Sequence, residues 1–87
     1  MGNLNFFTYI LLLCDGTYYT GITNSLLRRM DEHANGKSKS TRAKRPLKLI
    51  YTKPFATRKE SRALEVHIKK RGAKRFLLQE KFKPKAT

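Results

Sequence analysis

The sequence predicts a single small α+β domain, in which an N-terminal hairpin plus a third strand form an antiparallel sheet flanked by about three helices. Two β-rich runs, residues 5–14 and 17–22, are separated by the hairpin signal Asp15-Gly16. Apolar residues recur at helical spacing after residue 24 and again after residue 57. A chain of 87 residues is sufficient for one domain, and we expect its core to lie within about residues 6–80.

The first predicted strand, residues 5–14, is too uniformly apolar to alternate between a core face and a solvent face. We therefore expect it to be the central strand, covered on both sides. Cys14 lies within this run and is expected to be a small buried hydrophobic residue. As the one cysteine of the chain, it cannot form an internal disulfide.

The register of the hairpin decides where its tyrosines point. If the loop is the pair Asp15-Gly16, Tyr9 and Tyr19 lie on opposite faces of the sheet. If the loop is residues 14–16 with a left-handed Gly16, the two tyrosines share a face. We favour the second register, in which two phenols could surround a phosphate beside the first helix.

The first predicted helix follows a glycine corner at Gly21. Asn24 or Thr23 is expected to cap it, because a short polar side chain accepts from backbone N–H groups that have no helical partner. Asn35-Gly36 is expected to end it in a left-handed conformation. Its predicted apolar stripe consists of Leu26, Leu27, Met30 and Ala34.

Arg29 and His33 stand four residues apart on this helix, so they share one flank. Such a pair is typical of an ordinary surface helix with a cationic side. The tyrosines upstream make these two residues candidates for a functional site.

Residues 46–53 alternate well enough for a third strand that ends before Pro54. Leu47, Leu49 and Tyr51 are expected on one side of it. The rest of the chain is read as helical, with residues 73–82 forming a short last helix that docks through its apolar residues, Phe76, Leu77 and Leu78. Residues 83–87 are expected to form a frayed tail.

A capping box, Thr57-Arg58-Lys59-Glu60, predicts the start of the second helix, and Gly72 predicts its end. One line of the helix carries Ser61, Leu64, Ile68 and Arg71. Glu65 borders this line, and a carboxylate in such a place needs a cation or a metal. A salt bridge to one of the many Lys and Arg residues is the simpler interpretation.

Charge is the strongest signal in the composition, because 20 Lys and Arg stand against 6 Asp and Glu and give a net charge of +14. An excess of this size implies a polyanionic partner, most simply nucleic acid, with an anionic membrane surface as the second choice. The polar loop 36–46 is interpreted as a phosphate-contacting segment, with a flexible linker as the alternative. The expected nucleic-acid contacts are Lys37, Lys39, Arg42, Lys44, Arg45, Lys69 and Lys70.

The longest apolar run is too short to cross a bilayer, and the N-terminus lacks the cationic region of a signal peptide. We therefore expect a cytoplasmic protein that does not associate with a membrane, and we favour a monomer.

The layout resembles the GIY-YIG nuclease domain, in particular its small stand-alone bacterial members, over about residues 7–78. Phe7-Thr8-Tyr9 stands at the first motif and keeps only its tyrosine, without the glycine and isoleucine. Tyr19-Thr20-Gly21 stands at the second motif and keeps its tyrosine and glycine. Ile22 stands where some members of the family have a lysine. The loop 36–46 is similar to the basic loop of the stand-alone members.

Three further residues match the family by order and spacing. Arg29 matches its arginine, His33 matches its histidine, and Glu65 matches the glutamate that binds a single divalent metal. The resemblance implies a metal-dependent DNA endonuclease that hydrolyses phosphodiester bonds, is structure-selective, and acts in DNA repair or recombination. Mg²⁺ or Mn²⁺ would be the implied cofactor, and DNA would be a better partner than RNA.

The implied chemistry assigns a role to each matched residue. Arg29 would fork onto a non-bridging phosphate oxygen, which a lysine could not do with two donors. Tyr9, helped by Tyr19 or His33, would orient or deprotonate the attacking water, and Arg29 and the metal would have to depress its pKa. The alternatives are a basic nucleic-acid-binding module without turnover and a basic partner of the ribosome or of a repair protein.

Overall fold

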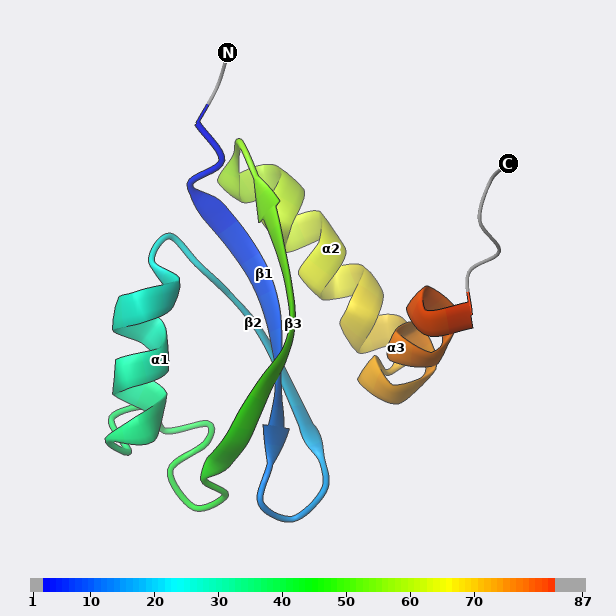
Figure 1. The fold of residues 1–87 in the computed structure, drawn as a ribbon. Helices are drawn as coiled ribbons and strands as arrows, with labels where there is room; N and C mark the ends of the chain where they lie inside the picture. The colour runs from blue at the N-terminus through cyan, green and yellow to red at the C-terminus, as the bar shows by residue number, and fades with distance from the viewer. Residues whose placement is uncertain (1–2, 83–87) are drawn as a thin grey trace.

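The computed structural model describes residues 3–82 and has three antiparallel strands and three helices (Figure 1). The sheet has the order β2-β1-β3. The α+β prediction is therefore confirmed, while the expected tail at 83–87 lies outside the described residues. The elements are β1 (Phe6–Leu13), β2 (Tyr18–Thr23), α1 (Leu26–Ala34), β3 (Pro46–Phe55), α2 (Arg58–Arg71) and α3 (Ala73–Phe82).

Strand β1 is the central strand and is covered on both faces, as its apolar run predicted. On one face, Tyr9 and Leu11 pack with residues of α1. On the other face, Ile10 packs with Ile68 of α2 and Phe76 of α3. Figure 1 shows α1 on one side of the sheet and α2 with α3 on the other. None of the helices within residues 3–82 has the length and apolar composition needed to cross a bilayer.

The hairpin adopts the second of the two registers, so this prediction is confirmed. Tyr9 pairs with Gly21 and Leu11 pairs with Tyr19, which places both tyrosines on the α1 face. Gly16 closes the loop with a φ of 86°, a left-handed value that favours glycine. The same three-residue loop begins at Cys14, whose side chain is exposed. The predicted burial of Cys14 is therefore wrong, because the residue lies in the loop and not in the strand.

Helix α1 begins one residue later than predicted. Ser25 is its N-cap and accepts from the backbone N–H of Arg28, so neither Thr23 nor Asn24 caps the helix. The hydroxyl of Thr23 instead donates to the Ser25 carbonyl, inside the corner. Gly36, with a φ of 72°, follows the end of the helix as expected.

The buried face of α1 is not the predicted apolar stripe. Leu26 and Met30 pack on the sheet, but Leu27 is 86% exposed and Ala34 is exposed as well. His33 is buried in their place and is 1% exposed. Positions 26, 30 and 33 follow one side of a helix, whereas adjacent leucines point in directions about 100° apart.

Strand β3 continues through Pro54 to Phe55, so the predicted end of the strand is wrong. A proline is tolerated there because β3 is an edge strand and needs no N–H on its open side. Two irregularities shift its pairing with β1, so that Tyr51 pairs with Ile10 while Leu49 pairs with Leu11. Tyr51 and Leu49 therefore lie on opposite faces, contrary to the prediction, and Leu47 in the second irregularity is 66% exposed.

The capping box starts α2 as predicted, since Thr57 accepts from the N–H of Glu60 and the Glu60 side chain accepts from the N–H of Thr57. Gly72 follows its last residue with a φ of 96°. In α3, Phe76 is 5% exposed and docks inward, but Leu78 is 48% exposed. The predicted docking of Leu78 is wrong, because three consecutive helical residues cannot all point to one face.

Candidate active site

Tyr9, Tyr19, Arg29 and His33 meet between the sheet and α1, although they come from three different elements. The Tyr9 hydroxyl lies 2.9 Å from His33 Nε2, and Arg29 Nε donates to it over 3.3 Å. The Tyr19 ring lies edge-on to His33, with 5.3 Å between ring centroids. A phenol, an imidazole and a guanidinium are thus joined in one contiguous cluster.

Gly21 permits this arrangement because it lies under the Tyr9 ring. A Cβ atom at position 21 would lie 2.6 Å from Tyr9 Oη and 2.8 Å from Tyr9 Cζ. No side chain fits there unless the phenol moves. Steric exclusion therefore explains why glycine occupies this position of the second motif: it lets the Tyr9 ring cross over β2 towards His33.

Tyr9 is protonated at neutral pH. Burial raises its pKa to about 12, and the hydrogen bond from Arg29 offsets this only in part. The mechanism expected from the sequence required Arg29 and the metal to depress the pKa of Tyr9. Arg29 alone does not lower this pKa below its ordinary value. The carboxylate of Glu65 also raises the pKa of Tyr9, as the smallest of the contributions.

His33 is neutral at pH 7, because burial and then the charge of Arg29 lower its pKa. Its Nδ1 atom lies 2.7 Å from the hydroxyl of Thr41, a residue that is fully buried. Ser38 is also buried and accepts from Arg29 Nη2 over 3.4 Å. The segment 35–45 is therefore packed onto the cluster and is not a flexible linker, so the linker alternative is wrong.

Arg29 is held by the protein on several sides. Its Nη1 donates to the Glu32 carboxylate over 2.8 Å, and this hydrogen bond lowers the pKa of Glu32. Burial opposes the charge on Arg29, but the bonds to Glu32 and Tyr9 raise the pKa of its guanidinium above the ordinary value. The cation is thus fixed in place beside the phenol.

Glu65 lies on α2 with a side chain that is 13% exposed. It pairs with Lys69 Nζ at 3.2 Å and with Arg62 Nε at 3.7 Å, so the salt-bridge interpretation of this residue is confirmed. Among the described residues there is no group of three or more His, Cys, Asp and Glu that could hold a metal ion. A single carboxylate fits a hydrated Mg²⁺ or Mn²⁺, whose other ligands are water and phosphate oxygens.

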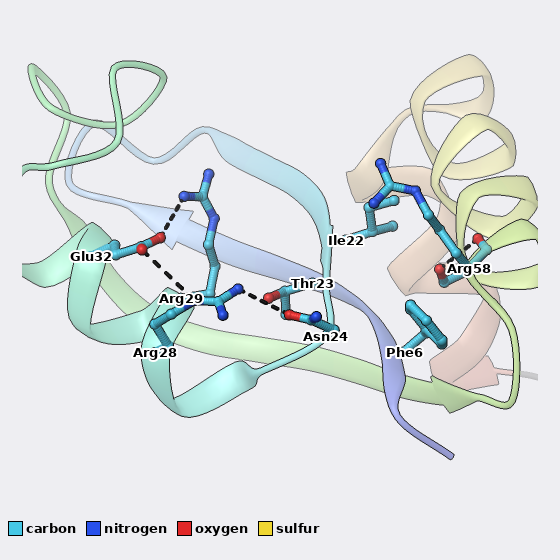
Figure 2. Close-up of a pocket in the computed structure, with 9 residues that line it drawn as sticks. Phe6, Ile22, Thr23, Asn24, Arg28, Arg29, Glu32 and Arg58 are labelled. Carbon is cyan, nitrogen blue, oxygen red and sulfur yellow. Dashed lines mark hydrogen bonds and ion pairs between the residues drawn. The ribbon is translucent and has the colours of Figure 1, made fainter. Parts of the chain in front are cut away.

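A pocket of about 360 Å³ opens beside Arg29, between the first turns of α1 and α2. Figure 2 shows Arg28 and Arg29 on α1 at one side of it and Arg58 on α2 at the other, with Phe6 nearby. Ser61 also lines the pocket, and Glu65 follows one helical turn later on the same side of α2. The pocket thus brings Arg29 of the cluster and the first turn of α2 together, whereas Glu65 is not among the residues that line it.

Sequence reasoning missed several of these residues. Arg28 and Arg58 line the pocket but were not among the predicted nucleic-acid contacts. The signal for Arg58 was present, because the residue sits inside the capping box, which fixes its position at the start of α2. The buried hydroxyls Ser38 and Thr41 gave no comparable signal, since they were grouped with phosphate-contacting residues of the loop.

Three of the predicted loop cations bind groups of the protein itself. Arg42 donates to the Gly36 carbonyl, Arg45 donates to the Ala34 carbonyl, and Lys44 pairs with Asp15 at 3.1 Å. The contacts of Arg45 and Lys44 attach the segment 35–45 to α1 and to the hairpin loop, whereas the contact of Arg42 lies within the segment. Contact with nucleic acid stays a prediction for these three residues and for Lys37, Lys39, Lys69 and Lys70, which are exposed.

Comparisons with known proteins agree with the fold. A model of the GIY-YIG catalytic domain matches residues 5–79. The UPF0213 protein YazA of Bacillus subtilis is 36% identical over 80 residues, covering 88% of this chain and 81% of YazA. A UPF0213 protein of Streptococcus pneumoniae serotype 4 is 42% identical over 66 residues, covering 75% of this chain and 67% of its own.

A solved structure is similar as well. The solution structure of a UPF0213 protein from Bacillus halodurans matches with a TM-score of 0.55 and 36% identity, covering 91% of this chain and 87% of the other. The family model covers most of the described residues, and its range includes all five matched site positions. The chain therefore belongs to the GIY-YIG catalytic domain family.

Proposed function

We propose that this protein is a divalent-metal-dependent endonuclease that hydrolyses phosphodiester bonds in DNA and selects its substrate by DNA structure. The observation that carries the proposal is the convergence of Tyr9, Arg29 and His33 beside an arginine-lined pocket. Membership of the GIY-YIG catalytic domain family supports a nuclease with a nucleic-acid substrate. A role in DNA repair or recombination is part of the proposal.

Arg29 would bind the reacting phosphate. Its Nη1 is engaged by Glu32 at 2.8 Å, whereas its Nη2 makes only a long bond of 3.4 Å to Ser38. Nη2 would therefore donate to a non-bridging oxygen in place of Ser38, while Glu32 keeps the guanidinium plane in position. Stabilisation of charge that develops on the phosphate is the largest contribution expected of such a donor.

Tyr9 would orient the attacking water. Because the pKa of Tyr9 is about 12, the phenol does not act alone as a base at neutral pH. It can accept a proton from water while its own proton passes to Nε2 of His33, at 2.9 Å. The water then becomes hydroxide as it attacks phosphorus, Tyr9 stays neutral, and His33 becomes the imidazolium.

Glu65 would hold Mg²⁺ or Mn²⁺ through a carboxylate oxygen, after loosening its ion pairs with Lys69 and Arg62. The ion, when bound, would supply charge stabilisation for the phosphate and the leaving oxygen. The backbone of the substrate would be held by Arg28 and Arg58 in the pocket. Such contacts position a strand without reading its bases, so selectivity would rest on the shape of the DNA.

The test is a cleavage assay with the purified protein and branched, nicked, single-stranded and duplex DNA, with RNA of matched sequence as a further substrate. Products should appear with Mg²⁺ or Mn²⁺ and disappear with EDTA. Arg29→Ala and Glu65→Gln should each lower the rate by at least about a hundredfold. Arg75→Ala and Glu80→Gln, which change the same charges at exposed positions of α3, should leave it unchanged. Cleavage unaffected by Arg29→Ala and Glu65→Gln would overturn the proposal.

A second candidate is a nucleic-acid-binding module that has lost turnover. The protonated state of Tyr9 and the engagement of Glu65 by Lys69 favour it. In that case binding would persist in EDTA and in Glu65→Gln, would weaken steeply with salt, and would yield no products. Cleavage that requires Glu65 would contradict this candidate.

A further inference from the structure

Thr41 is the most buried residue of the segment 35–45. Its side chain has no exposed surface, and its hydroxyl lies 2.7 Å from Nδ1 of His33. The backbone around it is fixed by two turns, since the N–H of Thr41 donates to the Ser38 carbonyl and the N–H of Lys44 donates to the Thr41 carbonyl. The Thr41 hydroxyl is therefore a rigid partner for the imidazole.

The hydrogen bonds of Tyr9 determine which nitrogen of His33 carries the proton. Within the described residues, the Tyr9 hydroxyl has two hydrogen-bond partners, Arg29 Nε and His33 Nε2. The guanidinium can only donate, so the buried phenolic proton has its acceptor at Nε2. In a neutral imidazole, an accepting Nε2 leaves the proton on Nδ1, where it donates to Thr41.

We propose that Thr41 is a positioning residue, which accepts from Nδ1–H of His33 and so holds the tautomer whose Nε2 accepts the proton of Tyr9. The segment 35–45 thereby supplies a hydrogen-bond partner to the cluster of Tyr9, Arg29 and His33. The tautomer stands on geometry alone, whereas its catalytic consequence, a proton path from water through Tyr9 to His33, rests on the proposed function. Loss of the Thr41 hydroxyl would leave Nδ1–H buried without an acceptor and would favour the other tautomer.

The direct test is the ¹⁵N spectrum of the histidine side chains, recorded through two-bond couplings on the wild type and on two variants. Thr41→Val keeps the shape and removes the hydroxyl, while Thr41→Ser keeps the hydroxyl. We expect the Nδ1–H pattern for His33 in the wild type and in Thr41→Ser, and its loss in Thr41→Val. The exposed His67 serves as the internal reference in every sample.

A wild-type spectrum with the proton on Nε2, or an unchanged Nδ1–H pattern in Thr41→Val, would overturn the inference. Because a misfolded Thr41→Val would also lose the Nδ1–H pattern, the loss counts only where the backbone amide spectrum of that variant matches the wild type, and the wild-type tautomer tests the inference in either case. In the cleavage assay, Thr41→Val should lower kcat by about tenfold to a hundredfold with little change in KM, and Thr41→Ser should restore it. The expected spectra without cleavage in any protein would overturn the proposed function and leave the tautomer assignment standing.

Discussion

The two faces of the sheet are built from alternating residues of the same strand, yet they are filled with different chemistry. On the α2 face, Ile10 packs against Ile68 and Phe76, and Thr8 adds one hydrogen bond to the Ser61 carbonyl. On the α1 face, Tyr9 packs with Leu11, Leu26 and Met30, but its hydroxyl also meets the buried imidazole of His33. A single strand thus separates an apolar core from a face that combines apolar packing with a hydrogen-bonded cluster.

The difference matters because the two kinds of packing respond differently to change. Apolar burial is not directional, and each buried aliphatic or aromatic side chain of the α2 face contributes about 1.5–3 kcal/mol. Buried polar groups stabilise only while they are paired, so the loss of one partner on the α1 face leaves another group without a bond. We therefore expect the apolar contacts of the α2 face to control stability, and the hydrogen-bonded cluster of the α1 face to control the proposed proton transfer.

The largest effect on stability is expected at Ile68, which has no exposed surface. Ile68→Ala should lower the free energy of unfolding by about 3 kcal/mol, because it leaves a cavity under the sheet. Urea denaturation measures the change, and the matched control is Leu27→Ala, since Leu27 is 86% exposed. Similar losses of unfolding free energy in Ile68→Ala and Leu27→Ala would contradict the difference between the two faces. A loss of activity in the folded molecules of Ile68→Ala would contradict it as well.

An intermediate effect is expected at Gly21. In Gly21→Ala the new Cβ would displace the Tyr9 ring from His33 and Arg29, since it would lie 2.6 Å from Tyr9 Oη. Cleavage should fall by about tenfold to a hundredfold in single-turnover assays, as expected for the loss of a positioned proton-transfer group. Adding Tyr9→Phe removes the closest clashing atom, so the double variant should be more stable than the sum of the two single changes predicts. Strict additivity would show that the alanine does not displace the phenol.

The smallest effect is expected from pH. Burial lowers the pKa of His33, so the unfolded chain binds a proton near its ordinary pKa of about 6.5 before the folded protein does. The stability that His33 contributes is therefore complete above that pH and is lost as the pH falls through the lowered pKa. Urea denaturation at pH 7.5 and pH 5 should show this loss, which should be smaller than that of Ile68→Ala.

Two controls assign the pH effect. His33→Gln should flatten the pH dependence, whereas the exposed His67→Gln should not. The pKa of Asp15 is lowered to about 2, first by its hydrogen bonds with Thr17, and the pKa of Glu32 is lowered by Arg29. Both carboxyl groups therefore titrate below the pH window of the experiment. A pH dependence that survives in His33→Gln would show that the α1 face does not hold a neutral imidazole.

The parts of the fold that were predicted correctly depend on neighbouring residues. A left-handed Gly16 selects the hairpin register, and the contacts of Thr57 with Glu60 start α2. The wrong predictions concern burial and strand pairing. Leu27 and Leu78 are apolar in sequence but lie on outward faces, and the irregular pairing of β3 reverses the face expected for Leu49.

The candidate site divides in the same way. Tyr9, Arg29 and Glu65 could be selected from the sequence because their order and spacing resemble a family. Thr41 could not be selected, because its contribution depends on how the segment 35–45 packs against His33.

The sequence by itself determined the order of the strands and helices, the turn that sets the hairpin register and the excess of positive charge, because each follows from residues close together in the chain. Only the tertiary structure decided which polar groups became partners. The phenol of Tyr9 meets an imidazole 24 residues away, and β1 meets α2 through a hydrogen bond that spans 53 residues. Such contacts arise from the packing of whole elements, and packing also sets the pKa values and the tautomer on which the chemistry depends.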